Sequence, residues 1–367
     1  MRTKTLTCIG ALAAVIGLNA STALGQIYIR TVPIGSAGNA ADTTGYGAVA
    51  YDYNIGTTEV TNWQYCAFLN AVARTDTNGL YNLAMGGSLG GIARAGAPGS
   101  YTYTTISGRA SHPVHSVSFW NATRFANWLH NGQPTGPQGN STTENGAYTL
   151  TPAGISQNTI TRNAGWLWAV PSEDEWYKAA YHQPPIQSGP AGGYWLYPTS
   201  TDTMATTRAN YGSSYPDTRN VREYADNFWD TFDMAGNVWE WNETIITTPS
   251  GPVRRGIRGG SRLSPAEDLR SDARGSLAPL SDGVTWGFRI VRSGVVVQPF
   301  SWADVASLGG SPIPDGMLTA DDITVFLEAF FSLNPLADVA GLGGSSGPDG
   351  ELTPDDLILF LEMFSGG

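Results

Sequence analysis

Cysteine, histidine and charge are all scarce in this chain of 367 residues. It has two cysteines, four histidines and only 14% charged residues. Cys8 belongs to an apolar N-terminal segment, so Cys66 is the only cysteine after it, and an intramolecular disulfide is excluded there. The low charge disfavours coiled coils and helical bundles. By contrast, 45 glycines and 22 prolines favour a loop-rich fold with short elements.

Clusters of Lys and Arg are also missing. The net charge is −11, so the basic surface by which proteins attract nucleic acids is absent from the sequence. After the N-terminal segment, no stretch reaches the ~18 apolar residues that a membrane span requires. We therefore expect no nucleic-acid partner and no membrane span.

Residues 1–25 have the order of a secretory signal peptide. Two cations, Arg2 and Lys4, precede the apolar run Leu6–Leu18, and small residues follow near Gly25. Cys8 lies at the start of this run and not after it, which disfavours a lipoprotein anchor. We expect a bacterial type of export to the cell-envelope exterior or the medium, with a mature chain that starts near Gln26.

A sharp change in composition marks a C-terminal module. Residues 293–367 contain eleven Asp and Glu and no Lys or Arg. Alignment of residues 303–330 with 337–364 gives 19 identities in 28 positions, which indicates a duplicated unit. The large apolar residues in each copy have helical spacing, so an all-α module is expected. The predicted domains are residues 26–294 and 303–367, joined by a linker at 295–302.

Helix signals are few in the large domain. Ser172 and Glu175 form a capping-box pattern that predicts a helix over residues 172–181. An apolar stripe predicts a second helix over residues 122–129, and a third candidate begins near Thr61. Two stretches rich in Gly, Ser, Thr and Asn are predicted to be surface loops: residues 83–108 and 131–163.

Several short motifs follow one another along residues 30–292. They are Thr58–Asn62, His112–Val114 leading to Val117–Trp120, Val170–Trp176, Asp233–Trp241, Arg258–Ser261 and Gly287–Arg289. Together they resemble the formylglycine-generating enzyme, or sulfatase-modifying-factor, family. The resemblance implies an α+β, loop-rich fold of the C-type-lectin-like kind.

The resemblance also raises the question of copper. In the family, two cysteines shortly after Gly-Gly-Ser bind copper and oxidise a substrate cysteine to formylglycine. Residues 261–274 contain no cysteine, and Ser264 and Leu269 fall where the thiols would be, although the segment is about three residues shorter. Because Cu(I) requires soft thiolate or thioether ligands, we expect neither copper nor formylglycine formation. Trp239, Ser261 and Ser264 remain candidates for lining the family's groove.

Iron is the second metal that the resemblance suggests, since sulfoxide-synthase relatives bind it through histidines of an additional helical domain. This chain has only His112, His115, His130 and His182. His112 and His115 flank a predicted strand, where residues i and i+3 point to opposite faces and chelate poorly. We expect no iron.

Calcium is expected in the segment that begins at Asp233. Carbonyls two residues apart in an extended segment point the same way, so Gly236 and Val238 can offer oxygens where the carboxylates of Asp233 and Glu240 converge. The family has a structural calcium at the matching positions, and the resemblance places a second one near Asn210 and the Tyr211 carbonyl. The alternative is that Glu240 only binds loop amides.

The tail repeats resemble the second half of a dockerin or EF-hand calcium loop. The oxygen donors would be Asp315, Thr319 and Asp322, then Asp349, Thr353 and Asp356. However, ten residues separate Asp304 from Asp315, where a standard loop has three. An alternative also fits the pattern, with Thr319 and Thr353 as helix N-caps and the aspartates near the helix N-termini.

Two functions follow from these features. The first is an exported binding or scaffold protein, with a protein or peptide ligand in the large domain and a protein partner for the tail. The second is an enzyme of the wider family that acts on an exported protein or peptide by another oxidative reaction. The cysteine-free segment after Ser261 favours the first.

Overall fold

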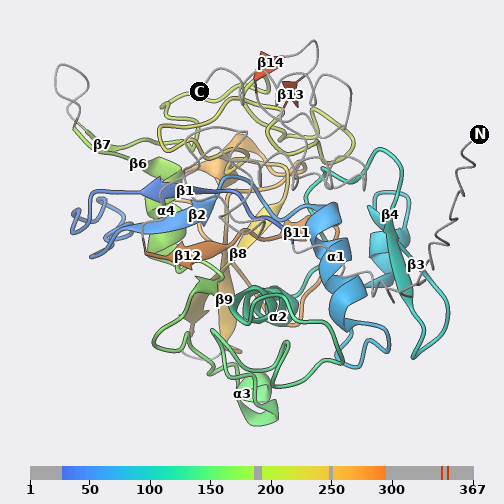
Figure 1. The fold of residues 1–367 in the computed structure, drawn as a ribbon. Coiled ribbons are helices and arrows are strands. Elements are labelled where there is room, and N and C mark those ends of the chain that lie inside the picture. The colour runs from blue at the N-terminus through green and yellow to red at the C-terminus, as the bar shows by residue number, and fades with distance from the viewer. Residues whose placement is uncertain (1–26, 186–191, 248–250, 295–339, 342–344, 347–367) are drawn as a thin grey trace, which may run out of the picture.

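The computed structural model describes residues 27–185, 192–247 and 251–294, together with 340–341 and 345–346 (Figure 1). Helices are few and short in these residues. The α-helices are α1 (Asn62–Val72), α2 (Phe119–His130), α3 (Pro152–Gln157) and α4 (Glu173–Tyr181), and the 3₁₀ turns are η1 (Leu83–Gly86) and η2 (Ala266–Leu269). The predicted signal peptide, the predicted linker and nearly all of residues 303–367 lie outside the described residues.

Two four-stranded sheets organise the large domain. The first has the order β1-β2-β12-β5, from strands β1 (Thr31–Ile34), β2 (Tyr53–Gly56), β12 (Val291–Ser293) and β5 (Trp168–Ala169), with antiparallel neighbours. The second has the order β10-β9-β8-β11, from strands β10 (Gly275–Leu277), β9 (Arg254–Arg258), β8 (Trp239–Ile246) and β11 (Trp286–Gly287). The pair β11 and β8 is parallel. The chain therefore has a mixed α and β fold with few helices.

Three further hairpins are small. They are β3 (Ile92–Ala95) with β4 (Thr102–Thr105), β6 (His182–Gln183) with β7 (Gly193–Tyr194), and β13 (Ala340–Gly341) with β14 (Ser345–Ser346). The first hairpin and α3 lie in the two stretches expected to be loops. Ile92 and Tyr103 of that hairpin are buried against the core, so tertiary packing forms strands where local composition favours loops.

All three predicted helices are present, and two begin with a capping box. In α4, the Ser172 side chain accepts from the Glu175 amide while the Glu175 carboxylate accepts from the Ser172 amide. Thr61 and Gln64 form the same reciprocal pair at the start of α1. These contacts satisfy backbone amides that have no partner within the first helical turn.

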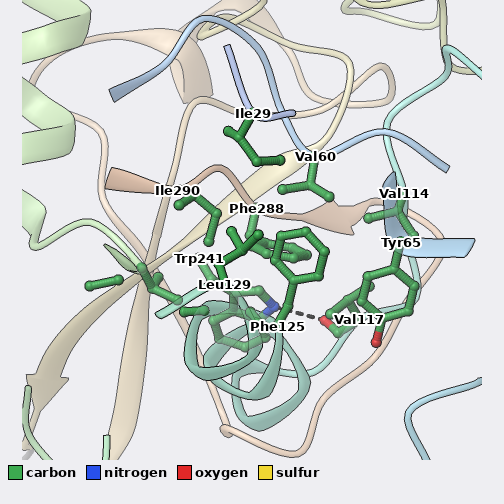
Figure 2. Close-up of a cluster of buried hydrophobic side chains, with 14 of the residues drawn as sticks. Ile29, Val60, Tyr65, Val114, Val117, Phe125, Leu129, Trp241, Phe288 and Ile290 are labelled. Carbon is green, nitrogen blue, oxygen red and sulfur yellow. Dashed lines mark hydrogen bonds between the residues drawn. The ribbon is translucent and has the colours of Figure 1, made fainter. Parts of the chain in front are cut away.

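The core lies between α1, α2 and the two sheets. Figure 2 shows aromatic side chains at its centre, with Phe125 of α2 close to Phe288 and to Tyr65 of α1. Trp241 of β8 is fully buried and donates from Nε1 to the Val117 carbonyl at 2.8 Å. In contrast, α3 contributes no buried side chain and protrudes at the edge of the domain (Figure 1).

Candidate functional site

The segment from Asp233 to Glu240 leads into β8 and lies inside the domain. Gly236 forms a parallel bridge with Asn210, and its amide donates to the Gly259 carbonyl at 2.9 Å. Its φ of +80° suits glycine, and a Cβ atom there would lie 2.1 Å from the Asn210 carbonyl oxygen. This close approach brings the loop that carries Asn210 beside the Gly-Gly-Ser segment.

Glu240 is the centre of a buried ion pair. Its carboxylate accepts from Arg289 Nε and Nη2, each at 2.6 Å, and from Trp176 Nε1 at 2.7 Å. Both side chains of the pair are almost completely buried. Arg289 also donates to the carbonyls of Gly56 and Phe232. The pair therefore joins β8 to the start of β12 and to the end of β2.

Two further acids surround this pair. Burial raises the pKa of Asp233 to about 6, although its Oδ2 accepts from the Arg222 amide at 2.6 Å. Burial, reinforced by the charges of Asp233 and Glu240, raises the pKa of Glu59 well above its usual range. Glu59 Oε1 accepts from Asn237 Nδ2 at 3.2 Å, whereas Oε2 is buried with no hydrogen-bond partner.

Asn210 is a second buried group with an unused oxygen. It is 1% exposed, its carbonyl accepts from the Asn237 amide, and its Nδ2 donates to the Asp217 carbonyl. Its Oδ1 has no hydrogen-bond partner. Tyr211 follows it at the half-buried start of an exposed loop, and the Tyr211 carbonyl accepts from the Ser214 amide.

The predicted calcium ligands are thus only partly brought together. Within the described residues, Asn210 Oδ1 and Glu59 Oε2 have no hydrogen-bond partner and suit a hard cation, but the Glu240 carboxylate is already paired with Arg289. Within residues 27–185, 192–247 and 251–294, no group of three or more His, Cys, Asp or Glu side chains is placed to hold a metal. Calcium binding stays a prediction. The six predicted tail ligands lie outside the described residues.

The segment after Gly-Gly-Ser has one hydroxyl and one apolar side chain, Ser264 and Leu269, at the positions where the resemblance predicts thiols. Ser261 is buried, and Ser264 is 6% exposed and accepts from the Gly212 amide through its carbonyl. Leu269 is completely buried and packs against Tyr197 and Ala209. Cys66 lies in α1, where burial raises the pKa of its thiol to about 12.

Large apolar side chains are exposed mainly on a group of neighbouring loops. Among the described residues, seven such side chains are exposed, and two of them, Tyr51 and Leu167, lie elsewhere. The remaining five, which we name the apolar loop face, are Leu83, Tyr215, Leu263, Leu280 and Val284. Trp239, one of the predicted groove residues, is half-buried beside these loops, and its amide donates to the Thr285 carbonyl.

Hydrogen bonds made by side chains tie these loops together. Asn82 donates to Asp282 at 2.6 Å, which joins the loop before Leu83 to the loop that carries Leu280 and Val284. Arg262 donates to the Pro216 carbonyl, which joins the segments of Leu263 and Tyr215.

Arg109 connects these two groups of loops. Its guanidinium pairs with Asp217 at 2.5 Å and donates to the carbonyls of Ser88 and Leu89. The exposed apolar side chains are therefore carried by a cross-linked set of loops, and this surface is formed before any ligand binds.

Two histidines lie under the same loops. His115 Nε2 is 2.7 Å from the Leu89 carbonyl oxygen, and His112 Nδ1 is 2.8 Å from Thr218 Oγ1. In the described part of the chain, neither histidine lies in a strand, contrary to the expectation that they flank one. Pro113, between them, forms an isolated antiparallel β-bridge with Thr61. Burial lowers the pKa of His112 to about 4. Each imidazole is thus held by a separate loop.

Sequence reasoning predicted neither the pair of Glu240 with Arg289 nor the following ion pairs. Arg258 and Arg274 both bind Glu173, and Arg162 bridges Glu175 and Glu243. Arg258 and Arg289 belong to the motifs Arg258–Ser261 and Gly287–Arg289, whose other residues are small or apolar. An arginine in such a motif was the signal from which a buried ion pair could have been predicted.

These motifs also identify the domain. Residues 30–294, most of the chain, match the family described as sulfatase-modifying factor enzyme 1-like domain, or FGE-sulfatase. The chain belongs to this family. The match covers both sheets and the ion pair of Glu240 with Arg289.

The curated relatives that this chain matches are longer proteins. Serine/threonine-protein kinase Pkn1 of Chlamydia trachomatis serovar L2 is 28% identical over 200 residues, which are 50% of this chain and 25% of that protein. The protein of the same name from Chlamydia pneumoniae is 27% identical over 201 residues, 51% of this chain and 25% of that protein. The chain thus spans about a quarter of the length of these relatives.

Three solved structures are similar to this chain at low sequence identity. Treponema denticola variable protein 1 has a TM-score of 0.48 and 19% identity, covering 74% of this chain and 97% of that one. CarF has a TM-score of 0.47 and 22% identity, covering 72% and 98%. PvdO from Pseudomonas aeruginosa has a TM-score of 0.40 and 19% identity, covering 72% and 91%. In the described part of this chain, no helix is long and apolar enough to cross a membrane.

Proposed function

We propose that this protein is an exported binding module of the FGE-sulfatase family that holds an apolar peptide segment on its apolar loop face and carries out no copper-dependent formylglycine formation. The observation that carries the proposal is that Leu83, Tyr215, Leu263, Leu280 and Val284 are exposed on segments that hydrogen bonds and an ion pair link to one another. Exposed apolar side chains that gather on one surface commonly mark a protein-binding site.

The charge on these loops supports an uncharged ligand. Arg109 and Asp217 neutralise each other, and Asp282 is hydrogen-bonded to Asn82. Because the Arg109 and Asp217 charges are paired, we expect binding to depend mainly on burial of apolar surface, and burying one leucine side chain contributes about 1.5–3 kcal/mol. A peptide with spaced Leu, Val or Phe side chains is the ligand of matching chemistry.

The thiol chemistry supports the loss of copper oxidation. The segment after Gly-Gly-Ser has Ser264 and the buried Leu269 in place of thiols, and Cys66 is a buried neutral thiol in another element. Neither hydroxyl nor leucine replaces a thiolate as a Cu(I) ligand. A cysteine peptide of the sulfatase type should therefore stay unchanged when incubated with the protein and copper.

The terminal segments complete the proposal. Residues 1–25 would direct export, and the duplicated acidic residues 303–367 would attach the module to a protein partner through a dockerin-like contact. Calcium would stabilise the tail through Asp315, Thr319 and Asp322 and their counterparts in the second copy, and it would stabilise the large domain through the Asn210 oxygen. The charge of the tail supports this proposal, because eleven carboxylates on a small module repel one another without a cation.

The experiment measures peptide binding by the full chain with fluorescence anisotropy. One labelled, unstructured peptide carries spaced leucines, and a second of equal length carries serines instead. We expect binding of the first peptide only, and at least about tenfold weaker binding by the Leu263→Ser/Leu280→Ser variant, because two apolar contacts are lost. The melting temperature should stay unchanged, since both side chains are exposed.

The matched control is Tyr51→Ser/Leu167→Ser, which removes exposed apolar side chains away from the apolar loop face. Equal binding of both peptides, or an equal loss in the control variant, would refute the proposed site. Conversion of a cysteine peptide to formylglycine at catalytic turnover, detected by mass spectrometry, would refute the absence of oxidase chemistry.

A further inference from the structure

A cavity of about 560 Å³ lies at the C-terminal end of α1, lined by α1 and by residues 74–77, Gly99 and residues 135–138. Its volume falls within the usual range of small-molecule sites, about 300–1,000 Å³. None of its lining residues belongs to the apolar loop face. The cavity is therefore a separate candidate site.

The walls of this cavity are held by backbone hydrogen bonds. The Arg74 carbonyl accepts from the amides of Gly99 and Tyr101, and the Gly136 amide donates to the Ala71 carbonyl. The Gln138 side chain accepts from the Asn78 amide at 2.8 Å. Because segments distant in sequence are fastened in this way, the shape of the cavity is set without a ligand.

Four of the exposed side chains that line the cavity are polar and have no partner among the described residues. Arg74, Thr75, Thr77 and Thr135 are exposed, and within the described residues none of these four side chains has a hydrogen bond or an ion pair. They offer one guanidinium and three hydroxyl groups.

Asp76, the acidic residue that lines the cavity, already has several partners within the protein. The Asp76 carboxylate accepts from the amides of Leu80 and Tyr81 and from Gln138, and it lies 3.6 Å from an Arg94 nitrogen. Its charge is engaged within the protein. Among the described lining residues, the charge that has no partner is therefore the positive charge of Arg74.

We propose that this cavity binds a sugar acid, that is, a small polyhydroxylated carboxylate. The planar guanidinium of Arg74 suits two-point contact with a carboxylate. The hydroxyl groups of Thr75, Thr77 and Thr135 can each donate and accept, as the hydroxyl groups of a sugar require. The site takes the carboxylate-bearing sugar either as a free molecule or at the end of a chain, since both present the same groups.

The test uses the full chain and isothermal titration calorimetry with glucuronate as the probe. Glucose lacks the carboxylate and acetate lacks the hydroxyl groups, so we expect each to bind at least about tenfold more weakly than glucuronate. Arg74→Gln should weaken glucuronate binding by about tenfold or more, since a charge-assisted contact is lost. Thr77→Val/Thr135→Val should weaken glucuronate but leave acetate unchanged.

The control variant is Arg208→Gln, which removes an exposed arginine outside the cavity. A similar loss in this variant, or equal affinities for glucuronate and acetate, would show that a general charge effect explains the binding and would overturn the proposal. Absence of saturable glucuronate binding would overturn it as well. A glucuronate-terminated oligosaccharide, compared with the free acid, distinguishes the two sources. Peptide binding at the apolar loop face should be unaffected by Arg74→Gln, so the two proposals fail independently.

Discussion

Arg289 shows at the scale of a single residue how this domain is held together. It is completely buried, and Glu240 provides its charged partner while backbone carbonyls accept its remaining donors. Removing one partner of a buried ion pair leaves the other charge in a poorly solvated site, which costs more than the pair itself contributes. Glu240 therefore has a structural role, whether or not the neighbouring oxygens bind a cation.

Glu240→Gln should lower the free energy of unfolding by about 3–5 kcal/mol even in the presence of a chelator, because it leaves Arg289 buried without a counter-charge. Urea denaturation followed by tryptophan fluorescence measures this. The exposed pair of Arg270 and Asp272 is the comparison, and Asp272→Asn should cost less than about 1 kcal/mol. If Glu240→Gln changes nothing in chelator but abolishes stabilisation by calcium, Glu240 acts as a calcium ligand.

His182 should make stability depend on pH. It is 8% exposed and stacks against Trp229, and burial, with the nearby Lys178 charge, lowers its pKa to about 4. An unfolded histidine has a pKa near 6.5, so between pH 6.5 and 4 the unfolded chain binds more protons than the folded one. Stability should therefore fall as the pH falls through this window, and level off below it.

His182→Gln should reduce the pH-dependent loss of unfolding free energy by up to about 3 kcal/mol. Urea unfolding of both proteins at pH 7 and again near pH 4.5 gives the difference. His130→Gln is the matched variant, since His130 is less buried than His182 and should contribute less. If both proteins lose the same unfolding free energy between pH 7 and pH 4.5, His182 is not the source of the pH dependence.

At the scale of elements, the helices differ in how much tertiary structure they support. In α2, every residue from Phe119 to Leu129 is buried, and α4 is buried over most of its length. In α3 no residue is buried, although Thr151 caps it in the same way. The same local signal thus begins a core helix in one place and a surface helix in another.

Ser172→Ala should cost about 1 kcal/mol of global stability, because α4 loses its cap while packed into the core. Thr151→Ala should instead increase hydrogen exchange of α3 amides with little change in global unfolding, since α3 has no buried residue and contacts the core through the half-buried Ile155. Hydrogen exchange by mass spectrometry, combined with urea unfolding, separates these outcomes. If both variants lower the free energy of global unfolding equally, α3 unfolds together with the core.

At the scale of the whole molecule, calcium should act on the tail. If the repeated Asp, Thr and Asp positions bind calcium, the full chain with Asp322→Ala/Asp356→Ala should bind fewer calcium ions than the wild type in calorimetric titrations. Sodium chloride at matched ionic strength controls for screening of the acidic tail. An unchanged stoichiometry would leave Thr319 and Thr353 as helix caps.

Sequence patterns alone were sufficient for some features and not for others. Motif order indicated the family of residues 30–294, which the comparison with known proteins confirmed. The Ser172–Glu175 pattern indicated α4, because a capping box is made by residues three positions apart. The two-residue strands β5 and β11 carry no such local signal and exist only through pairing with distant segments.

What the sequence by itself determined is the set of local contacts and the inventory of chemical groups. It determined that no second thiol accompanies Cys66 in the large domain and that Glu240 lies two residues from Val238. Only the tertiary structure decided that Glu240 pairs with Arg289, 49 residues away, and that Leu83 and Leu280 belong to loops joined by Asn82 and Asp282. The physical reason is that a buried charge requires a partner, whichever part of the chain supplies it, and sequence spacing carries no record of that choice.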